Sequence, residues 1–177
     1  MKLYLVLSLL IIALLIPQSV QARRTTPDDL AREALQAYEN TLKTYTPTHQ
    51  QNLKDMTTKI ADTNRSLSAQ LTAAMETQAV ILDEYQTRLG KGNLQESFHS
   101  PQDGKNSTDP LDQARYWVTY AHEAVAWQAA KQYTITLTGE KNIKSDALQT
   151  IGALRADLAS TRQKVLNSQA LLQKVVK

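Results

Sequence analysis

The stretch that decides the fold is THQQNLKDMTTKIADTNRSLSAQLTAAMETQAVILDEYQTRL, residues 48–89. It contains neither proline nor glycine, and its apolar positions recur in ten steps from residue 53 to residue 89. That is 36/10, or 3.6 residues per step, the period of a straight α-helix. The stripe comprises Leu53, Met56, Ile60, Asn64, Leu67, Leu71, Ala74, Gln78, Leu82, Tyr85 and Leu89. We therefore predict one uninterrupted helix, roughly 63 Å long at about 1.5 Å per residue, that stops at Gly90.

The length of this helix sets the expected shape. A compact domain of roughly 155 residues has a radius of gyration near 15 Å, so a rod of this length predicts an elongated molecule. Two polar residues, Asn64 and Gln78, fall inside the apolar stripe. They are either polar contacts to a partner or places where the stripe thins.

Three further segments favour helix. The first begins at Pro27, whose ring suits the first helical position, and ends near Tyr45. The next begins at Asp109 and Pro110, a cap followed by proline. The last, residues 142–176, has apolar steps of three and four that form a heptad seam. This seam comprises Ile151, Leu154, Leu158, Thr161, Val165, Ser168, Leu172 and Val175. We expect this helix to pack antiparallel to the helix over residues 48–89.

The segment from Tyr133 to Thr138 alternates and is rich in β-branched residues, which suits a strand. No second run is present to pair with it, so we predict a helix end closed by Gly139. The alternative is an edge strand that pairs with another chain. The predicted fold is all-α: an elongated antiparallel hairpin or bundle of about four helices, forming one domain over residues 23–177 with a long loop at 90–109.

Residues 1–22 have the layout of a secretory signal peptide. Lys2 is followed by an apolar run from Leu3 to Ile16, interrupted only by Ser8, and the segment ends at Ala22. The run is shorter than the roughly 20 residues of a transmembrane helix. We predict cleavage after Ala22, with an uncleaved membrane anchor as the alternative. The chain is then exported, to the periplasm in a diderm bacterium and otherwise to the medium, with no stable membrane insertion.

Composition excludes several classes of site. The chain has no cysteine, which removes disulfides, thiolate metal sites and a cysteine nucleophile. Its five glycines form no phosphate-binding motif. Without Lys2, Lys+Arg falls from 20 to 19 against 17 Asp+Glu, a net charge of +2. Because these charges are dispersed, we expect no nucleic-acid partner.

No set of side chains points to catalysis. His122 and Glu123 begin like an HExxH zinc motif, but residue 126 is alanine. The adjacent pairs of carboxylates diverge by about 100° on a helix and do not face one site. We therefore predict a protein that is not an enzyme, with no cofactor and no metal.

The strongest candidate surface is an aromatic stripe on the helix that follows Pro110. Its members, Tyr116, Tyr120, Glu123 and Trp127, are spaced to share one helical face. A second face gathers Ala114, Trp117, Val118, Ala121, Ala124, Val125, Gln128 and Ile135. The stripe is either core beneath another helix or a docking surface for a protein partner.

Leu94 and Phe98 are the hydrophobic residues of the 90–109 loop. They are candidate anchors of a recognition tip, with a flexible connector as the alternative.

These features predict an exported helical interaction or scaffold protein of the cell envelope, with protein partners in the envelope, among which a second copy of the chain is one candidate. In layout, with a signal peptide, long antiparallel helices and a tip, the chain resembles the small exported subunits of conjugative type IV secretion. That resemblance implies a subunit, tip or adhesin component of a secretion or conjugation apparatus, and no sequence motif accompanies it. The alternative is an exported sensor or carrier that binds a small ligand between the last two helices, beside Trp117 or Trp127.

Overall fold

The computed structural model describes residues 27–90 and 105–177. Four α-helices occupy these residues, and no strand lies among them, so the predicted all-α class is confirmed. The helices are α2 (Pro27–Leu42), α3 (Pro47–Arg88), α5 (Pro110–Ala130) and α6 (Ile143–Val176), with one 3-10 turn, η3 (Glu140–Asn142), before α6. The chain divides into two units, residues 1–33 and 34–177.

In the first unit the described residues are the opening turns of α2, where Arg32 forms an ion pair with Asp29 at 3.7 Å. The predicted signal segment, residues 1–22, and the candidate loop anchors Leu94 and Phe98 lie outside the described residues.

The predicted helix start at Pro110 and the stop at Gly90 are confirmed. Helix α3 begins one residue before the predicted Thr48, and α2 ends at Leu42 rather than near Tyr45. Pro47 and Pro110 occupy the first turns of α3 and α5, where the missing N–H has no helical partner to lose. The Asp109 carboxylate caps α5 by accepting from the Leu111 N–H at 2.9 Å. Gly90 follows the end of α3 with a φ of 64°, a left-handed conformation that glycine adopts without strain.

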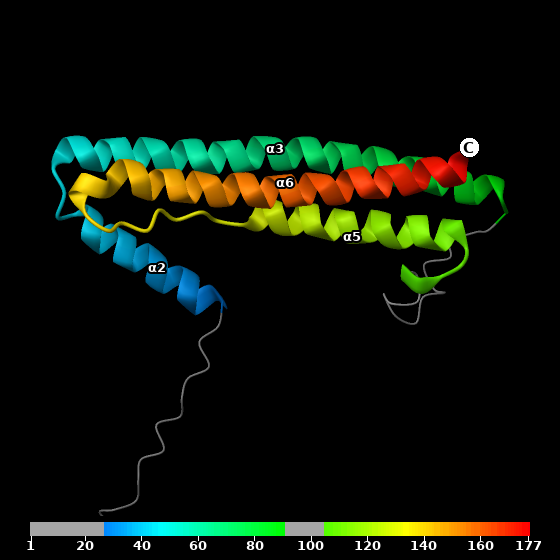
Figure 1. Ribbon diagram of the computed structural model, residues 1–177, viewed down its shortest axis with the longest axis horizontal. Coiled ribbons are helices and arrows are strands. Elements are labelled where there is room, and N and C mark those ends of the chain that lie inside the picture. The colour runs from blue at the N-terminus through cyan, green and yellow to red at the C-terminus, as the bar shows by residue number, and fades with distance from the viewer. Residues whose placement is uncertain (1–26, 91–104) are drawn as a thin grey trace, which may run out of the picture. The chain divides into compact units, whose positions relative to one another are not determined.

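Within residues 34–177, α3 and α6 lie side by side and run in the same direction, while α5 runs opposite to both (Figure 1). The contacts between α3 and α6 agree with this direction. Met56, early in α3, packs near Ile151, early in α6, while Gln78, later in α3, bonds to Ser168, later in α6. The prediction that the last helix runs antiparallel to the long helix is therefore wrong. Beyond the end of α5 the chain continues to the end of the bundle where α3 starts, so α6 starts there as well.

The crossing is made by residues 131–139, which are extended. At about 1.5 Å per residue, α5 covers roughly 32 Å while α6 covers roughly 51 Å. Nine more helical residues would add only about 14 Å, whereas nine extended residues reach up to about 30 Å. The chain therefore has to leave the helix to return to the start of α3.

This extended segment corrects the prediction of a helix end at residues 133–138, since α5 already ends at Ala130. Its alternation is real: Ile135 is fully buried and Tyr133 and Leu137 are half-buried, while Thr136 and Thr138 are exposed. The apolar side chains enter the core directly, and no partner strand is present among the described residues.

The core of residues 34–177 consists of two apolar clusters. One lies where α2, the extended segment and the first halves of α3 and α6 meet, and contains Leu42, Tyr45, Leu53, Ile60, Ile135, Ile143, Ala147, Leu154 and Leu158. The other lies between α3, α5 and the second half of α6, and contains Met75, Leu82, Leu111, Val118, Ala121, Val125, Val165 and Leu172. The heptad seam of α6 is confirmed, because its central members, Thr161 and Ser168 included, are buried.

The stripe predicted along α3 has the right period but is wrong at several positions, and its last member, Leu89, is 48% exposed. Ser68 and Met75 are fully buried, although neither belongs to the predicted stripe. Leu67, which does belong to it, is 39% exposed. A shift of one residue turns a side chain by about 100°, so packing against the other helices decides which of two neighbouring residues faces the core. No described helix combines the length and the hydropathy needed to cross a membrane.

Candidate functional site

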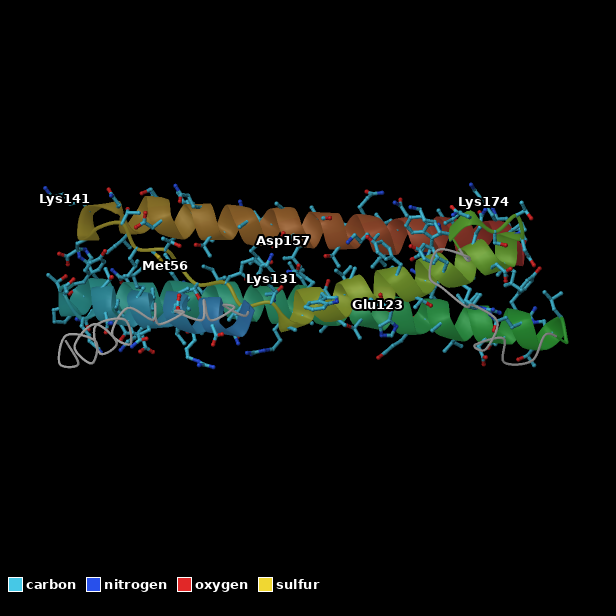
Figure 2. All side chains as sticks on the ribbon, turned by 90° about the horizontal axis from the view of Figure 1, so that it is seen from below. Met56, Glu123, Lys131, Lys141, Asp157 and Lys174 are labelled. Atoms are coloured by element: carbon cyan, nitrogen blue, oxygen red, sulfur yellow. The ribbon has the colours of Figure 1, made fainter. Side chains whose placement is uncertain are left out.

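The outer face of α5 carries the side chains predicted as a stripe. Glu123 is exposed, Tyr116 is half-buried, Tyr120 is 37% exposed and Trp127 is 79% exposed. Figure 2 looks onto the bundle from the side of α5, with Glu123 labelled. The interpretation of this stripe as core is therefore wrong for the part of the chain that the structure describes. We call Tyr116, Tyr120, Glu123 and Trp127 the α5 stripe.

Three aromatic rings stabilise one another at the start of this stripe. Tyr116 and Tyr120 stack at 6.1 Å between centroids, and Trp117 meets both edge-on, at 5.3 Å from Tyr116 and 5.6 Å from Tyr120. The Lys164 ammonium from α6 lies 5.0 Å from the centre of the Tyr120 ring. Such ring pairs and cation–π contacts limit the freedom of the rings, so this half of the surface is held in place before any partner arrives.

Sequence analysis missed the part that Trp117 plays. We placed it on the small-residue face, but it is only half-buried and packs among the tyrosines. The signal was its position three residues before Tyr120, a spacing at which side chains on a helix are neighbours.

The inner face of α5 fixes the stripe to the bundle. Ala114, Val118, Ala121, Val125 and Gln128 are all buried, as the predicted small-residue face requires. Alanine at two of these positions lets α5 approach the other helices closely. The stripe is therefore carried on a rigid element rather than on a loop.

A buried polar layer lies between the two apolar clusters, where α5 ends. Asn64 Nδ2 donates to the carbonyl oxygens of Gln128 and Lys131, both at 3.0 Å. Gln128 Nε2 donates to Asn64 Oδ1 at 2.8 Å and to the Tyr133 hydroxyl at 2.9 Å. The Asn64 amide of α3 thus bonds to two carbonyls at the end of α5, which fixes the position of α3 along α5.

The layer continues onto α6 through Asp157. The Tyr133 hydroxyl donates to Asp157 Oδ2 at 2.7 Å, and the Lys131 ammonium bonds to the same oxygen. Lys131 and Asp157 are labelled in Figure 2. These two donors hold the pKa of Asp157 below its usual range, and the bond from Lys131 has the larger effect. Burial, with the neighbouring carboxylate, raises the pKa of Tyr133 to about 12.

A second polar contact links α3 to α6 further along. Ser168 Oγ donates to Gln78 Oε1 at 2.8 Å, and Gln78 Nε2 donates to the Val165 carbonyl oxygen at 3.2 Å. Asn64 and Gln78 are both buried, so neither marks a thinning of the stripe. They are polar contacts, and the helices they meet belong to the same chain.

No group of three metal-ligating side chains lies together among the described residues. His122 is exposed on α5. His49, at the start of α3, bonds instead through Nδ1 to Glu140 Oε1 at 2.7 Å.

Two surface hollows, of about 330 and 310 Å³, lie along the α3–α6 seam. The first is lined by Met56, Lys59, Ile60, Thr63, Leu67, Ile151, Leu154, Arg155 and Leu158, and the second by Ala74, Thr77, Gln78, Ile81, Gln169, Leu172, Gln173 and Val176. Neither tryptophan lines these two hollows, which differs from the ligand site between the last two helices that the alternative function predicts.

Comparison of the chain with protein-family models, with curated proteins and with solved structures gives no significant match.

Proposed function

We propose that this chain is an exported interaction protein of the cell envelope that contacts a protein partner through the α5 stripe. The observation that carries the proposal is Trp127, which is 79% exposed on a well-anchored helix. Exposing a large aromatic ring to water is unfavourable, and Trp and Tyr supply much of the binding energy at protein interfaces.

The anchoring of α5 supports this role. Buried side chains fix its inner face, and the Asn64 and Gln128 amides fix its end. A partner would then meet a preformed surface and lose little conformational entropy on binding.

Export is the second part of the proposal and rests on the sequence of residues 1–22. The apolar run from Leu3 to Ile16 and the terminal Ala22 fit a signal that is removed. A role as a subunit of a secretion or conjugation apparatus, periplasmic in a diderm host, is the form of this function that the layout favours.

Export is tested by expressing the full chain and sequencing the N-terminus of the protein recovered from the periplasmic extract. We expect the sequence to begin at Arg23. A chain that retains Met1 and sediments with membranes would contradict cleavage and favour the anchor.

Contact is tested by placing a photo-reactive amino acid at Trp127 in living cells. Irradiation should give a discrete adduct from this position and none from Glu76, an exposed residue of α3. Equal adducts from both positions, or none, would contradict the proposal. A ligand-dependent change in tryptophan fluorescence of the pure protein would instead support the sensor or carrier.

A further inference from the structure

The α5 stripe has a spacing that is symmetric about its own centre. Its members are separated by four, three and four residues, with the midpoint between Ala121 and His122. A second helix of the same sequence, laid antiparallel on this face, therefore brings Tyr116 opposite Trp127 and Tyr120 opposite Glu123. A twofold axis through the midpoint relates the two copies, as in most symmetric dimers.

The chemistry of the opposed residues is complementary. Glu123 is exposed and forms no hydrogen bond or ion pair with any residue that the structure describes. In the antiparallel arrangement its carboxylate meets the Tyr120 hydroxyl, a donor. Lys164 lies beside that same Tyr120 ring, so a cation also stands next to the incoming carboxylate.

The two ends of α5 carry side chains of opposite charge, of which the Lys131 ammonium is also bonded to Asp157 of its own chain. Asp112 lies in the first turn of α5, and Lys131 follows its last residue. Antiparallel copies place the acidic end of one helix near the basic end of the other. Parallel copies would place like charges together and align the two helix dipoles unfavourably.

Small side chains beside the stripe leave room for close packing. Thr119, Ala126 and Ala130 are all exposed on this side of α5. Small residues at a helix contact let two backbones approach within the usual distance of about 8–10 Å. The bulky rings of Tyr116 and Trp127 can then fill the space at the two ends of the contact.

We infer that the α5 stripe binds a second copy of this chain, antiparallel, with Tyr116 against Trp127 and Glu123 against Tyr120 and Lys164 of the other copy. This inference rests on the contact role proposed above and names the partner of that surface.

The first test is self-association of the full chain, expressed with its own N-terminal segment and purified as the cell processes it. Analytical ultracentrifugation over a concentration series should show a monomer–dimer equilibrium. Trp127→Ala should weaken it about tenfold or more with unchanged helix content by circular dichroism. The matched control Val80→Ala removes another exposed apolar side chain, 57% exposed on α3, and should leave it unchanged.

Charge reversal tests the register. Glu123→Lys or Lys164→Glu alone should weaken the dimer by opposing like charges, and the double variant should restore it.

Two single-cysteine variants, Asp112→Cys and Ala130→Cys, test whether the two copies of α5 run antiparallel, in a chain that has no cysteine. They should form a disulfide only when mixed. Disulfides within either variant alone would indicate parallel copies and overturn the inference.

The outcomes separate this inference from the proposed function. A chain that stays monomeric at all concentrations, or a dimer that Trp127→Ala leaves intact, overturns self-association through the stripe. If position 127 still gives its adduct in cells in that case, the contact role remains and the partner is another protein.

Discussion

At the scale of the residue, Asn64 shows how a polar side chain in an apolar stripe can organise a core. Its amide donates to two carbonyls at the end of α5, and its oxygen accepts from Gln128 and, at 3.4 Å, from Ser68. A buried amide with these partners offsets its own desolvation, and only one register of α3 against α5 supplies them.

Replacing Asn64 tests this account. Asn64→Ala removes one hydrogen-bond partner from the Gln128 amide and one from each of the Gln128 and Lys131 carbonyls. We expect the free energy of unfolding, measured by urea denaturation, to fall by about 1–3 kcal/mol. Gln70→Ala, at an exposed position of α3, should change it by less than about 0.5 kcal/mol. Equal effects from the two variants would show that the polar layer contributes no specific stability.

At the scale of the element, the notable feature is the extended segment over residues 131–139, which continues the path of the chain beyond the end of α5. The segment is anchored where Ile135 enters the first apolar cluster and where the Thr138 N–H donates to Asp146 at 2.8 Å.

Ile135→Ala should lower the free energy of unfolding by roughly 2–5 kcal/mol, because a cavity opens in a closed core. Thr136→Ala, at the exposed neighbouring position, is the matched control. Similar losses from both would place Ile135 outside the core.

The start of α3 is joined to η3 by Glu140. Its Oε1 accepts from the Thr46 N–H and from His49 Nδ1, both at 2.7 Å. These bonds lower the pKa of Glu140 from 4.5 to about 2, and the bond from the Thr46 N–H has the largest effect. Because the folded pKa is the lower one, the contribution of Glu140 to stability is present above about pH 4.5 and is lost as the pH falls toward 2.

This sign gives a measurable trend. The thermal midpoint of Glu140→Gln should lie below that of the wild type at neutral pH, and the difference should shrink as the pH falls from 4.5 toward 2. Glu76→Gln, on the exposed face of α3, should show no such trend. A difference for Glu140→Gln that grows in acid would show that the joint between α3 and η3 depends on another group.

At the scale of the whole molecule, the direction of the helices within residues 34–177 is the decisive feature. The parallel run of α3 and α6 puts Asn52 and Lys144 near the same end of the two helices, while Lys174 lies about 45 Å further along α6. In a chain without cysteine, paired cysteine variants can carry dyes at these exposed positions.

Energy transfer between the dyes should be high for Asn52→Cys with Lys144→Cys. It should be low for Asn52→Cys with Lys174→Cys. The reverse order would restore the antiparallel packing that the sequence favoured.

The sequence by itself determined the number of helices and several of their limits, but not the end of α5. Their proline starts, the Gly90 stop and the 3.6-residue period depend on neighbours along the chain, which any sequence displays. The aromatic stripe on α5 was likewise readable from spacing alone. The tertiary structure decided whether that stripe is covered, because exposure depends on which helices pack against it.

Only the tertiary structure decided the direction of α6 and the conformation of residues 131–139. The alternation of this segment was visible, but its meaning depended on the unequal lengths of α5 and α6, a distance that no local pattern encodes. The same holds for Asn64 and Gln78. Their polarity was plain in the sequence, but their partners lie roughly 64 to 90 residues away and meet them only when the bundle closes.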